Sequence, residues 1–290
     1  MPSLDAARVR AFLVILALIL PAPARVAGRF EQGLLWRVET PGIAPSYLFG
    51  TLHSDDERVV KLSPKARRAF DRAGVVAMEA LGEETATRRY RAAMVGREPQ
   101  LPALLGEDYA RVEALLRESG VPREIVPRIK PWAALIILLQ PRDATGLTLD
   151  NLLLFEAGKR GKPIVHLESV EEQIEALDGM APETQVILLR DAQARFEEIQ
   201  AAVYPTLSAY AAGDLAAQFR INAETMGAGA AQEAFLQRLL YARSERFAER
   251  LAPLLKQGGV FAAFGALHLY GPRGVPALLE RRGFRVTRVR

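Results

Sequence analysis

Two separate stretches of the chain carry the same pattern, an apolar run that ends in Phe-Gly-small-Leu-His. The first copy ends at His53 and the second at His268. Because the chain has 22 glycines among 290 residues, about one histidine in thirteen would have glycine three positions earlier by chance, yet two of the three histidines do. Each copy is typical of a buried strand with a histidine just beyond its end. We therefore expect at least two such strands in the fold.

Glycine at the end of each apolar run lets the backbone turn sharply or approach a neighbouring segment closely. A histidine beyond it projects into the crevice where α/β sheets bind ligands. If the two strands are neighbours, the two imidazoles converge. A single histidine of this kind is more simply explained as a structural residue, but the pair predicts that His53 and His268 form one functional site. His166 lies in a strand outside the repeated pattern and is expected to be structural.

Glu79 follows a third apolar run, Val75–Met78, at the point where the two histidines follow theirs. A carboxylate at the end of a buried strand is costly unless it is paired or bound to a metal. Two imidazoles and one carboxylate suit Zn²⁺, Mn²⁺, Co²⁺ or Fe²⁺, and an open position would make a bound water nucleophilic. The alternative is that Glu79 caps a helix or meets an arginine. A solvated acidic turn explains Asp55, Asp56 and Glu57 more simply than further metal ligands do.

The remaining pattern predicts an α/β fold that borders on α+β. Strands are expected in the N-terminal part, about 33–80, and in the C-terminal part, about 258–290, forming a central mixed, partly parallel sheet. The middle of the chain, about 83–256, is expected as a large helical insertion. The runs Leu34–Val38 and Ser46–Phe49 indicate a hairpin, and Ser63-Pro64 opens a helix that leads to the next strand. Such a strand-helix-strand order predicts a right-handed crossover.

Composition and charge exclude several classes of function. The chain has no cysteine, which excludes disulfide frameworks, zinc knuckles, thiol catalysis and iron–sulfur clusters. Its 38 Lys and Arg are scattered among 34 Asp and Glu, without the continuous basic stripe that nucleic-acid binding needs. The densest basic cluster is C-terminal, and a charged helix end followed by an edge strand explains it: Arg281, Arg282, Arg285, Arg288 and Arg290. We expect no nucleic-acid partner.

The first residues are typical of a secretory signal peptide. Arg8 and Arg10 precede the apolar run Ala11–Leu20, and Pro21-Ala22-Pro23-Ala24 follows. A ten-residue apolar helix is about 15 Å long, against a hydrocarbon core of roughly 30 Å, so no stable membrane span is expected. We predict a signal peptide at 1–24, cleaved after Ala24, and a single exported domain at 25–290, located in the periplasm. A buried N-terminal helix is the alternative.

An ordered set of short motifs runs from Leu34 to Val289. In chain order the motifs are Leu35-Trp36, Tyr47–His53, Met78-Glu79, Leu149-Asp150, Ala157–Lys159, Leu167–Gln173, Phe264–Leu269 and Gly271. As a set they resemble the TraB/GumN family, within the larger group that includes the TIKI metalloproteases, erythromycin-esterase-like proteins and haem-binding ChaN-like proteins. The resemblance implies a paired Gly-x-x-His site with a glutamate and an arginine, and metal-dependent hydrolysis.

His53 and His268 match the two histidines of that site, and Glu79 matches its glutamate. The family's Arg-Asn pair falls on Arg243-Ser244, so the arginine is kept and the asparagine is replaced by serine. Arg243 would hold a substrate carboxylate or stabilise an oxyanion, although an exposed helix arginine is an equal alternative.

Two further acidic residues of the motif set, Asp150 and Glu168, are expected to order the scaffold through caps and helix termini.

Two functions of different classes fit these residues. The first is a metal-dependent hydrolase in which His53, His268 and Glu79 bind Mn²⁺, Co²⁺ or Zn²⁺; cleavage of a peptide is what the TIKI resemblance implies, and a small-molecule substrate stays open. The second is a periplasmic protein without turnover that uses the same histidines to hold haem or a metal ion, with Tyr47 or Tyr270 near the site. A scaffold with a degenerate site is a third option.

Overall fold

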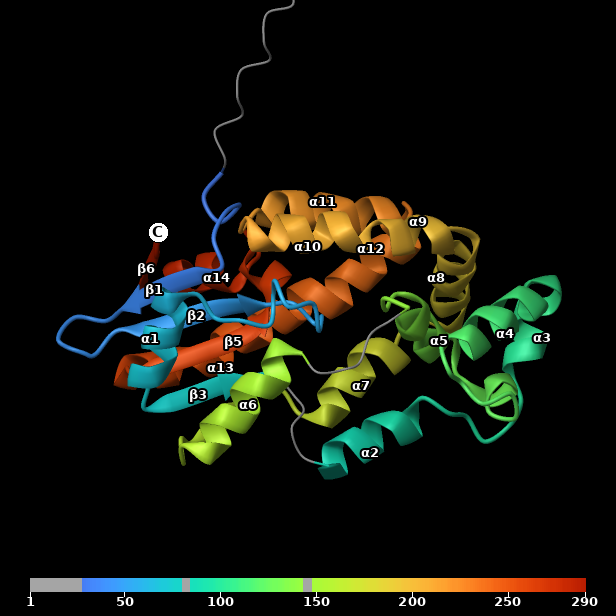
Figure 1. Ribbon diagram of the computed structural model, residues 1–290, viewed down its shortest axis with the longest axis horizontal. Coiled ribbons are helices and arrows are strands. Elements are labelled where there is room, and N and C mark those ends of the chain that lie inside the picture. The colour runs from blue at the N-terminus through green and yellow to red at the C-terminus, as the bar shows by residue number, and fades with distance from the viewer. Residues whose placement is uncertain (1–27, 80–83, 143–147) are drawn as a thin grey trace, which may run out of the picture.

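The computed structural model describes residues 28–79, 84–142 and 148–290, and the signal peptide predicted at 1–24 lies outside these residues (Figure 1). Its centre is a six-stranded sheet with the order β4-β3-β5-β2-β1-β6. The strands are β1 (Leu35–Glu39), β2 (Ser46–Thr51), β3 (Val75–Met78), β4 (Ile164–His166), β5 (Val260–Gly265) and β6 (Arg285–Arg288). The strands β4, β3, β5 and β2 are parallel, whereas β1 pairs antiparallel with β2 and β6. The predicted mixed α/β sheet is confirmed.

The two copies of the repeated pattern lie side by side. β2 and β5 pair in parallel, with Gly50 opposite Phe264 and Thr51 opposite Gly265. β5, from the C-terminal part, enters the sheet between β2 and β3 of the N-terminal part. The expected hairpin of β1 and β2 is present, and β2 and β3 run in the same direction with β5 between them. The sheet therefore brings the carboxyl ends of β2, β5 and β3 to one edge.

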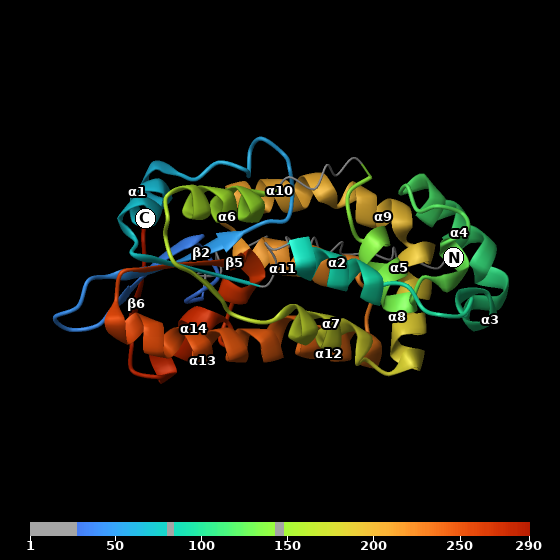
Figure 2. The same ribbon diagram turned by 90° about the horizontal axis from the view of Figure 1, so that it is seen from below.

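Helices cover both faces of the sheet (Figure 2). α1 (Pro64–Arg72) and α6 (Leu149–Lys159) pack on the face that carries Phe261 and Ala263 of β5, whereas α13 (Ala242–Gln257) and α14 (Val275–Arg281) pack on the face that carries Ala262 and Phe264. Successive side chains of a strand point to opposite faces, and all four of these β5 side chains are buried. A strand buried on both faces reads as a continuous apolar run, which is the pattern in the sequence.

The rest of the chain forms a helical half beyond the carboxyl ends of the parallel strands (Figure 1). Its helices are α2 (Glu84–Ala93), α3 (Leu101–Leu105), α4 (Tyr109–Glu118), α5 (Pro131–Leu138), α7 (Val170–Asp178), α8 (Pro182–Ala194), α9 (Phe196–Ala201), α10 (Val203–Ala211), α11 (Leu215–Thr225) and α12 (Ala230–Leu236). A π-helical turn, Gln237–Tyr241, joins α12 to α13. Trp132 of α5 is fully buried in a separate apolar cluster with α4 and α8.

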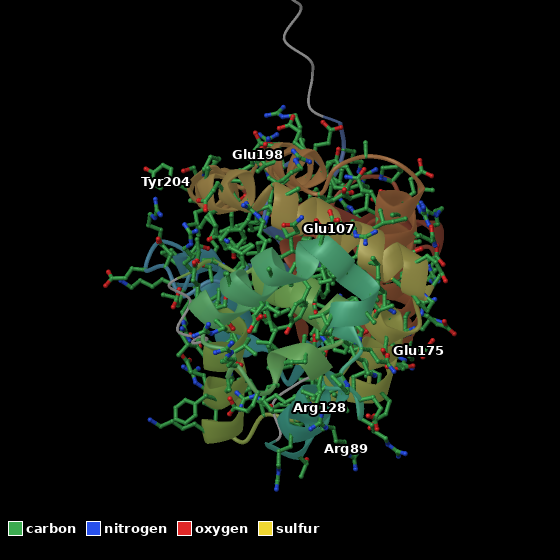
Figure 3. The ribbon with its side chains drawn as sticks, turned by 90° about the vertical axis from the view of Figure 1, so that its right-hand side faces the viewer. Arg89, Glu107, Arg128, Glu175, Glu198 and Tyr204 are labelled. Carbon is green, nitrogen blue, oxygen red and sulfur yellow. The ribbon has the colours of Figure 1, made fainter. Side chains whose placement is uncertain are left out.

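Charged side chains cover the outside of the helical half. In the view onto that end, Glu107, Arg128 and Glu175 point outward (Figure 3). At the opposite end, β6 is an edge strand and its Arg285 pairs with Glu39 of β1, as expected for the C-terminal arginines. Across the described residues, no helix is both long enough and apolar enough to span a bilayer.

Candidate functional site

A pocket of about 260 Å³ lies where β2, β3 and β5 end. His53 follows β2, Glu79 directly follows β3, and His268 lies in a 3₁₀ turn, Ala266–Leu269, directly after β5. Arg243 reaches the same pocket from α13. The structure thus brings together all four residues singled out from the sequence.

Gly50 is needed because the first turn after β5 lies directly against β2. A Cβ atom at position 50 would lie 2.8 Å from the Cα atom of Ala266, closer than such atoms approach in proteins. The second glycine of the repeat, Gly265, has a different task. Its backbone N–H donates to Oε1 of Glu79 at 2.6 Å. One glycine therefore permits the close packing of the two motifs, and the other holds the carboxylate.

Arg243 connects two buried carboxylates. Its Nη2 lies 2.8 Å from Oε2 of Glu79, and its Nε lies 3.1 Å from both carboxylate oxygens of Glu168. All three residues are less than a tenth exposed. Burial alone would raise the pKa of Glu79, but the guanidinium of Arg243, with smaller contributions from the two histidines and the N–H of Gly265, lowers it to about 2. The sequence left open whether Glu79 pairs with an arginine and whether Arg243 is exposed. In the structure Glu79 pairs with Arg243, and Arg243 is buried.

His268 is held through its Nδ1 atom. The ring is 4% exposed, and Nδ1 lies 2.8 Å from Oγ of Ser244. Because the Ser244 hydroxyl donates its proton to the carbonyl of Leu240, it accepts from Nδ1–H, and this assigns the tautomer. Nε2 then carries the lone pair and lies 3.9 Å from Oε1 of Glu79. Burial, followed by the charge of Arg243, lowers the pKa of His268 to about 3, so the ring is neutral at pH 7.

His53 lies at the mouth of the pocket, with 57% of its side chain exposed. Its Nδ1 lies 3.3 Å from Oδ2 of Asp150, and Oδ1 of Asp150 accepts from the hydroxyl of Thr51 at 2.7 Å. Burial lowers the pKa of His53, but the Asp150 carboxylate outweighs it and raises the pKa to about 9, although water screens this half-open pair in part. His268 is thus held through a hydrogen bond of Nδ1, whereas His53 has Nδ1 at ion-pair distance from Asp150.

The expectation that Asp150 and Glu168 serve only as caps and helix termini is corrected. Asp150 lies in the first turn of α6, but its side chain faces His53. Glu168 has a fully buried side chain that pairs with Arg243 and Arg246. Glu168 lies two residues after β4, and β4 is only partly buried, so the reasoning about a carboxylate directly after a buried strand did not find it.

The other acidic and histidine side chains near the motifs have simpler tasks. Asp56 binds Arg58 with both carboxylate oxygens at 2.7 Å, as expected for a surface turn. The Nδ1 atom of His166 lies 3.1 Å from the backbone carbonyl of Glu79. Within the described ranges, no group of three His, Asp or Glu side chains is arranged to hold a metal ion as it stands.

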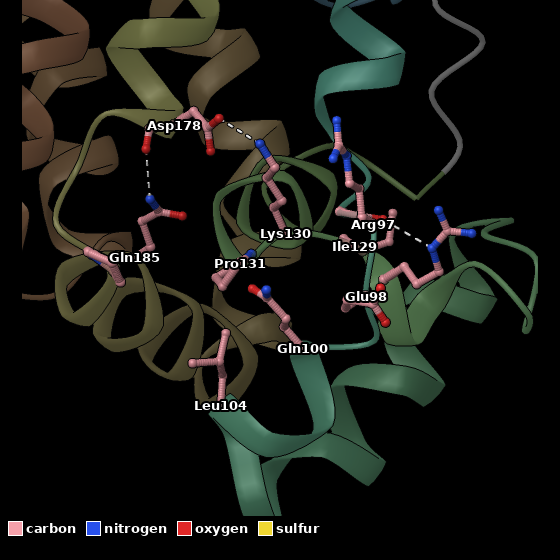
Figure 4. Close-up of a pocket in the computed structure, with 12 residues that line it drawn as sticks. Arg97, Glu98, Gln100, Leu104, Ile129, Lys130, Pro131, Asp178 and Gln185 are labelled. Atoms are coloured by element: carbon pink, nitrogen blue, oxygen red, sulfur yellow. Dashed lines mark hydrogen bonds and ion pairs between the residues drawn. The ribbon is translucent and has the colours of Figure 1, made fainter.

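A larger cleft, of about 570 Å³, lies in the helical half (Figure 4). Lys130 and Asp178 on its wall pair with each other at 2.6 Å. The buried Gln185 amide is also fully used: it donates to the carbonyls of Asp178 and Met180 and accepts from the N–H of Trp132. These contacts stabilise the junction of α5, α7 and α8, and they do not point to a ligand.

One known family has a sequence pattern that matches residues 34–288, nearly the whole described chain. The chain belongs to the TraB/PrgY/gumN family. The match extends from β1 to β6 and so includes the sheet, the helical half and the pocket. The resemblance inferred from the ordered motifs is confirmed.

Two curated relatives of this TraB-family chain are metalloproteases by name. Metalloprotease TIKI2 of Danio rerio is 26% identical over 321 aligned positions, which cover 90% of this chain and 62% of that protein. Metalloprotease TIKI1 of Xenopus tropicalis is 26% identical over 331 positions, which cover 88% of this chain and 61% of that protein. The chain therefore spans about three fifths of the length of the relatives it matches. No solved structure matches it.

Proposed function

We propose that this TraB-family chain is a metal-dependent hydrolase that cleaves peptide bonds. The observation that carries the proposal is the meeting of His53, His268, Glu79 and Arg243 at one pocket, from four separate parts of the chain. The names of the TIKI relatives support a metalloprotease activity. The pocket also lies where parallel α/β sheets bind their ligands.

The donor chemistry of the pocket fits a divalent transition metal such as Mn²⁺, Co²⁺ or Zn²⁺. His53 and His268 each have Nδ1 turned to an oxygen of a neighbouring side chain, which is the usual arrangement of metal-binding histidines. Nε2 of the neutral His268 is free to bind, whereas Nε2 of His53 binds only when an ion displaces the proton that Asp150 stabilises. Glu79 supplies the carboxylate. Because Nε2 of His268 lies 3.9 Å from Oε1 of Glu79, the side chains must draw together around an ion. A metal held by these three residues would act as a Lewis acid on the scissile carbonyl.

The chain's own residues then orient and stabilise the reacting groups. Arg243 keeps Glu79 ionised, and the N–H of Gly265 fixes the direction of the carboxylate. An ionised, positioned carboxylate with a pKa of about 2 suits a metal ligand, and it is too weak a base to take a proton readily at neutral pH. The exposed face of His53 is the part of the site that an incoming substrate meets first. Ser244, at the position of the family's asparagine, holds His268 through Nδ1.

The haem alternative receives no support from the two tyrosines near the motifs. The ring of Tyr270 stacks on Phe219 with a centroid distance of 4.7 Å, and Tyr47 packs against the α1–α6 face of the sheet. A pocket of about 260 Å³ is also below the range of about 300–1,000 Å³ that is usual for drug-sized ligands, so it is small for a whole haem. Haem binding is kept as an outcome of the test below.

We also propose that the protein is exported to the periplasm, on the strength of the signal-like segment 1–24. Expression of the full chain followed by cell fractionation tests this. Mature protein in the periplasmic fraction that begins at Arg25 is expected, whereas full-length chain in the cytoplasm would contradict it.

The function is tested by metal content and peptide cleavage measured together. The purified protein is incubated with Mn²⁺, Co²⁺ or Zn²⁺, freed of excess metal, and compared with His53→Ala, His268→Ala and Glu79→Gln. We expect about one ion per wild-type chain, loss of that ion in each variant, and loss of peptide cleavage with it. Asp56→Asn is the matched control, because it removes a carboxylate close to His53 that pairs only with Arg58 in the contacts described above.

Two results would overturn the proposal. Full cleavage activity in both histidine variants would show that the site does not carry the reaction. A wild-type protein that binds none of the three metals, and that develops a Soret band on titration with haemin, would replace the hydrolase with a haem-binding protein; His53→Ala or His268→Ala should then abolish that band.

A further inference from the structure

The pocket has an apolar wall beside its charged residues. Met226, Phe235, Leu236 and Leu239 line it from the end of α11, from α12 and from the π-helical turn. π-helical turns inside helices are rare and frequently occur at functional sites. Here the turn ends two residues before Arg243, so one stretch of chain supplies both part of the apolar wall and the buried guanidinium.

Gln218 of α11 also lines the pocket. The residue is 2% exposed, and Oε1 is buried without a hydrogen-bond partner among the described residues. Buried polar atoms are nearly always hydrogen-bonded, so such an oxygen needs an explanation. A group that enters the pocket and carries an N–H would supply the missing donor. A primary amide offers an acceptor and donors in one plane, which matches the N–H and C=O of a peptide unit.

We infer that the apolar wall and Gln218 form a substrate subsite that takes a large apolar side chain, such as leucine or phenylalanine, together with the peptide amide of the same residue. This inference rests on the proposed hydrolase only for the position of that residue, which is next to the cleaved bond. The volume of about 260 Å³ suits one side chain with its amide. The positive charge of Arg243 is already matched by Glu79 and Glu168, so the subsite does not select an acidic side chain.

The subsite is tested by binding, which does not require turnover. N-acetyl-leucinamide and N-acetyl-aspartamide are titrated into the full chain, and binding is followed by NMR chemical shifts. We expect the leucine ligand to bind at least tenfold more tightly. Gln218→Leu keeps the apolar volume, removes the amide, and is expected to weaken that binding by tenfold or more without loss of folding, since the oxygen it removes has no partner.

Two further variants complete the test. Leu239→Ser places a hydroxyl in the apolar wall, and it should weaken binding of the leucine ligand but not of N-acetyl-glycinamide. Gln193→Leu is the matched control, because Gln193 is also buried with an unpartnered Oε1 but lies on α8, outside the pocket. Binding by the control should equal that of the wild type.

The outcomes separate the subsite from the proposed function. Equal affinity for the two ligands, or unchanged binding in both Gln218→Leu and Leu239→Ser, would overturn the subsite even if the protein cleaves peptides. Selective binding of the leucine ligand by a protein that cleaves nothing would uphold the subsite and overturn the hydrolase. Cleavage preferentially beside leucine or phenylalanine, lost selectively in Gln218→Leu, would support both.

Discussion

Replacement of Arg243 by methionine removes the guanidinium that lies between two buried carboxylates. Methionine retains most of the apolar stem, so the change is mainly one of charge and hydrogen bonding. Glu168 keeps its contact with Arg246 at 3.2 Å, whereas Glu79 keeps only the N–H of Gly265 as a close donor in the described contacts. The variant therefore leaves at least one buried carboxylate without a cation.

Removal of one partner from a buried ion pair typically lowers the free energy of unfolding by about 3–5 kcal/mol. Urea denaturation followed by circular dichroism at pH 7 measures this loss. With an m-value of about 3 kcal/mol/M, the denaturation midpoint should fall by about 1–2 M. Arg89→Met is the matched control: the Arg89–Glu171 pair has the same 2.8 Å separation as Arg243–Glu79, but both side chains are more than half exposed. Its midpoint should stay close to that of the wild type.

The free energy of unfolding that Arg243→Met loses depends on pH in a definite direction. In the wild type the pKa of Glu79 is lowered to about 2, so its stabilising contribution is present above the pKa of the unfolded chain and is lost as the pH falls toward 2. Without Arg243, burial raises the pKa of Glu79, and the folded variant takes up a proton more readily than the unfolded chain. The difference in free energy of unfolding between the wild type and Arg243→Met, called the deficit below, should therefore be largest at pH 7 and smaller at pH 5. A deficit below 1 kcal/mol at pH 7, or one of equal size at both pH values, would refute this reasoning.

Three further outcomes are expected. Gly50→Ala places a methyl group against backbone of the turn after β5, so thermal stability should fall by several degrees together with metal binding; an unchanged melting temperature would contradict the close approach. Asp150→Asn removes the charge that raises the pKa of His53, so the NMR titration of that ring should move from about 9 toward or below its ordinary value, and the stabilisation that is lost as the pH rises through 9 should disappear; an unmoved titration would show that another group is responsible. Ser244→Ala removes the acceptor of Nδ1–H of His268, so ¹⁵N shifts should report a mixture of tautomers, whereas a single unchanged tautomer would show that Ser244 does not select it.

The pairing of the two motifs was predictable because strands of a parallel sheet end at the same edge. The two apolar runs, each followed by glycine and histidine, bring their imidazoles together if the strands are neighbours, and β2 and β5 are neighbours. The position of Glu79 at the same edge was predicted by the same rule, because Glu79 directly follows β3. The fold class was accessible for a similar reason, since strands buried on both faces and helices with defined caps have strong local signals.

The contacts of Asp150 and Glu168 with the site residues, and the apolar wall of the pocket, were not predictable in the same way. Asp150 lies at a helix start, where a cap is the usual explanation of an acidic residue, and only the packing of α6 against the sheet turns it to His53. The burial of Arg243 depends on the direction in which α13 presents that side chain. Met226 and Leu239 look like ordinary core residues of amphipathic helices, and nothing local distinguishes a core face from a pocket wall.

The insertion of β5 between β2 and β3 also bears on when the protein can fold. The N–H of Val260 donates to the hydroxyl of Ser46, 214 residues earlier in the chain. β2 and β3 have no common neighbour until β5 has been synthesised, so the central pairing is among the most non-local that the chain makes, and such topologies fold slowly. A ribosome-bound chain that ends before residue 260 lacks both the middle strand and His268. The site is thus assembled in the last steps of folding, and an incomplete chain that already carries His53, Glu79 and Arg243 still lacks His268.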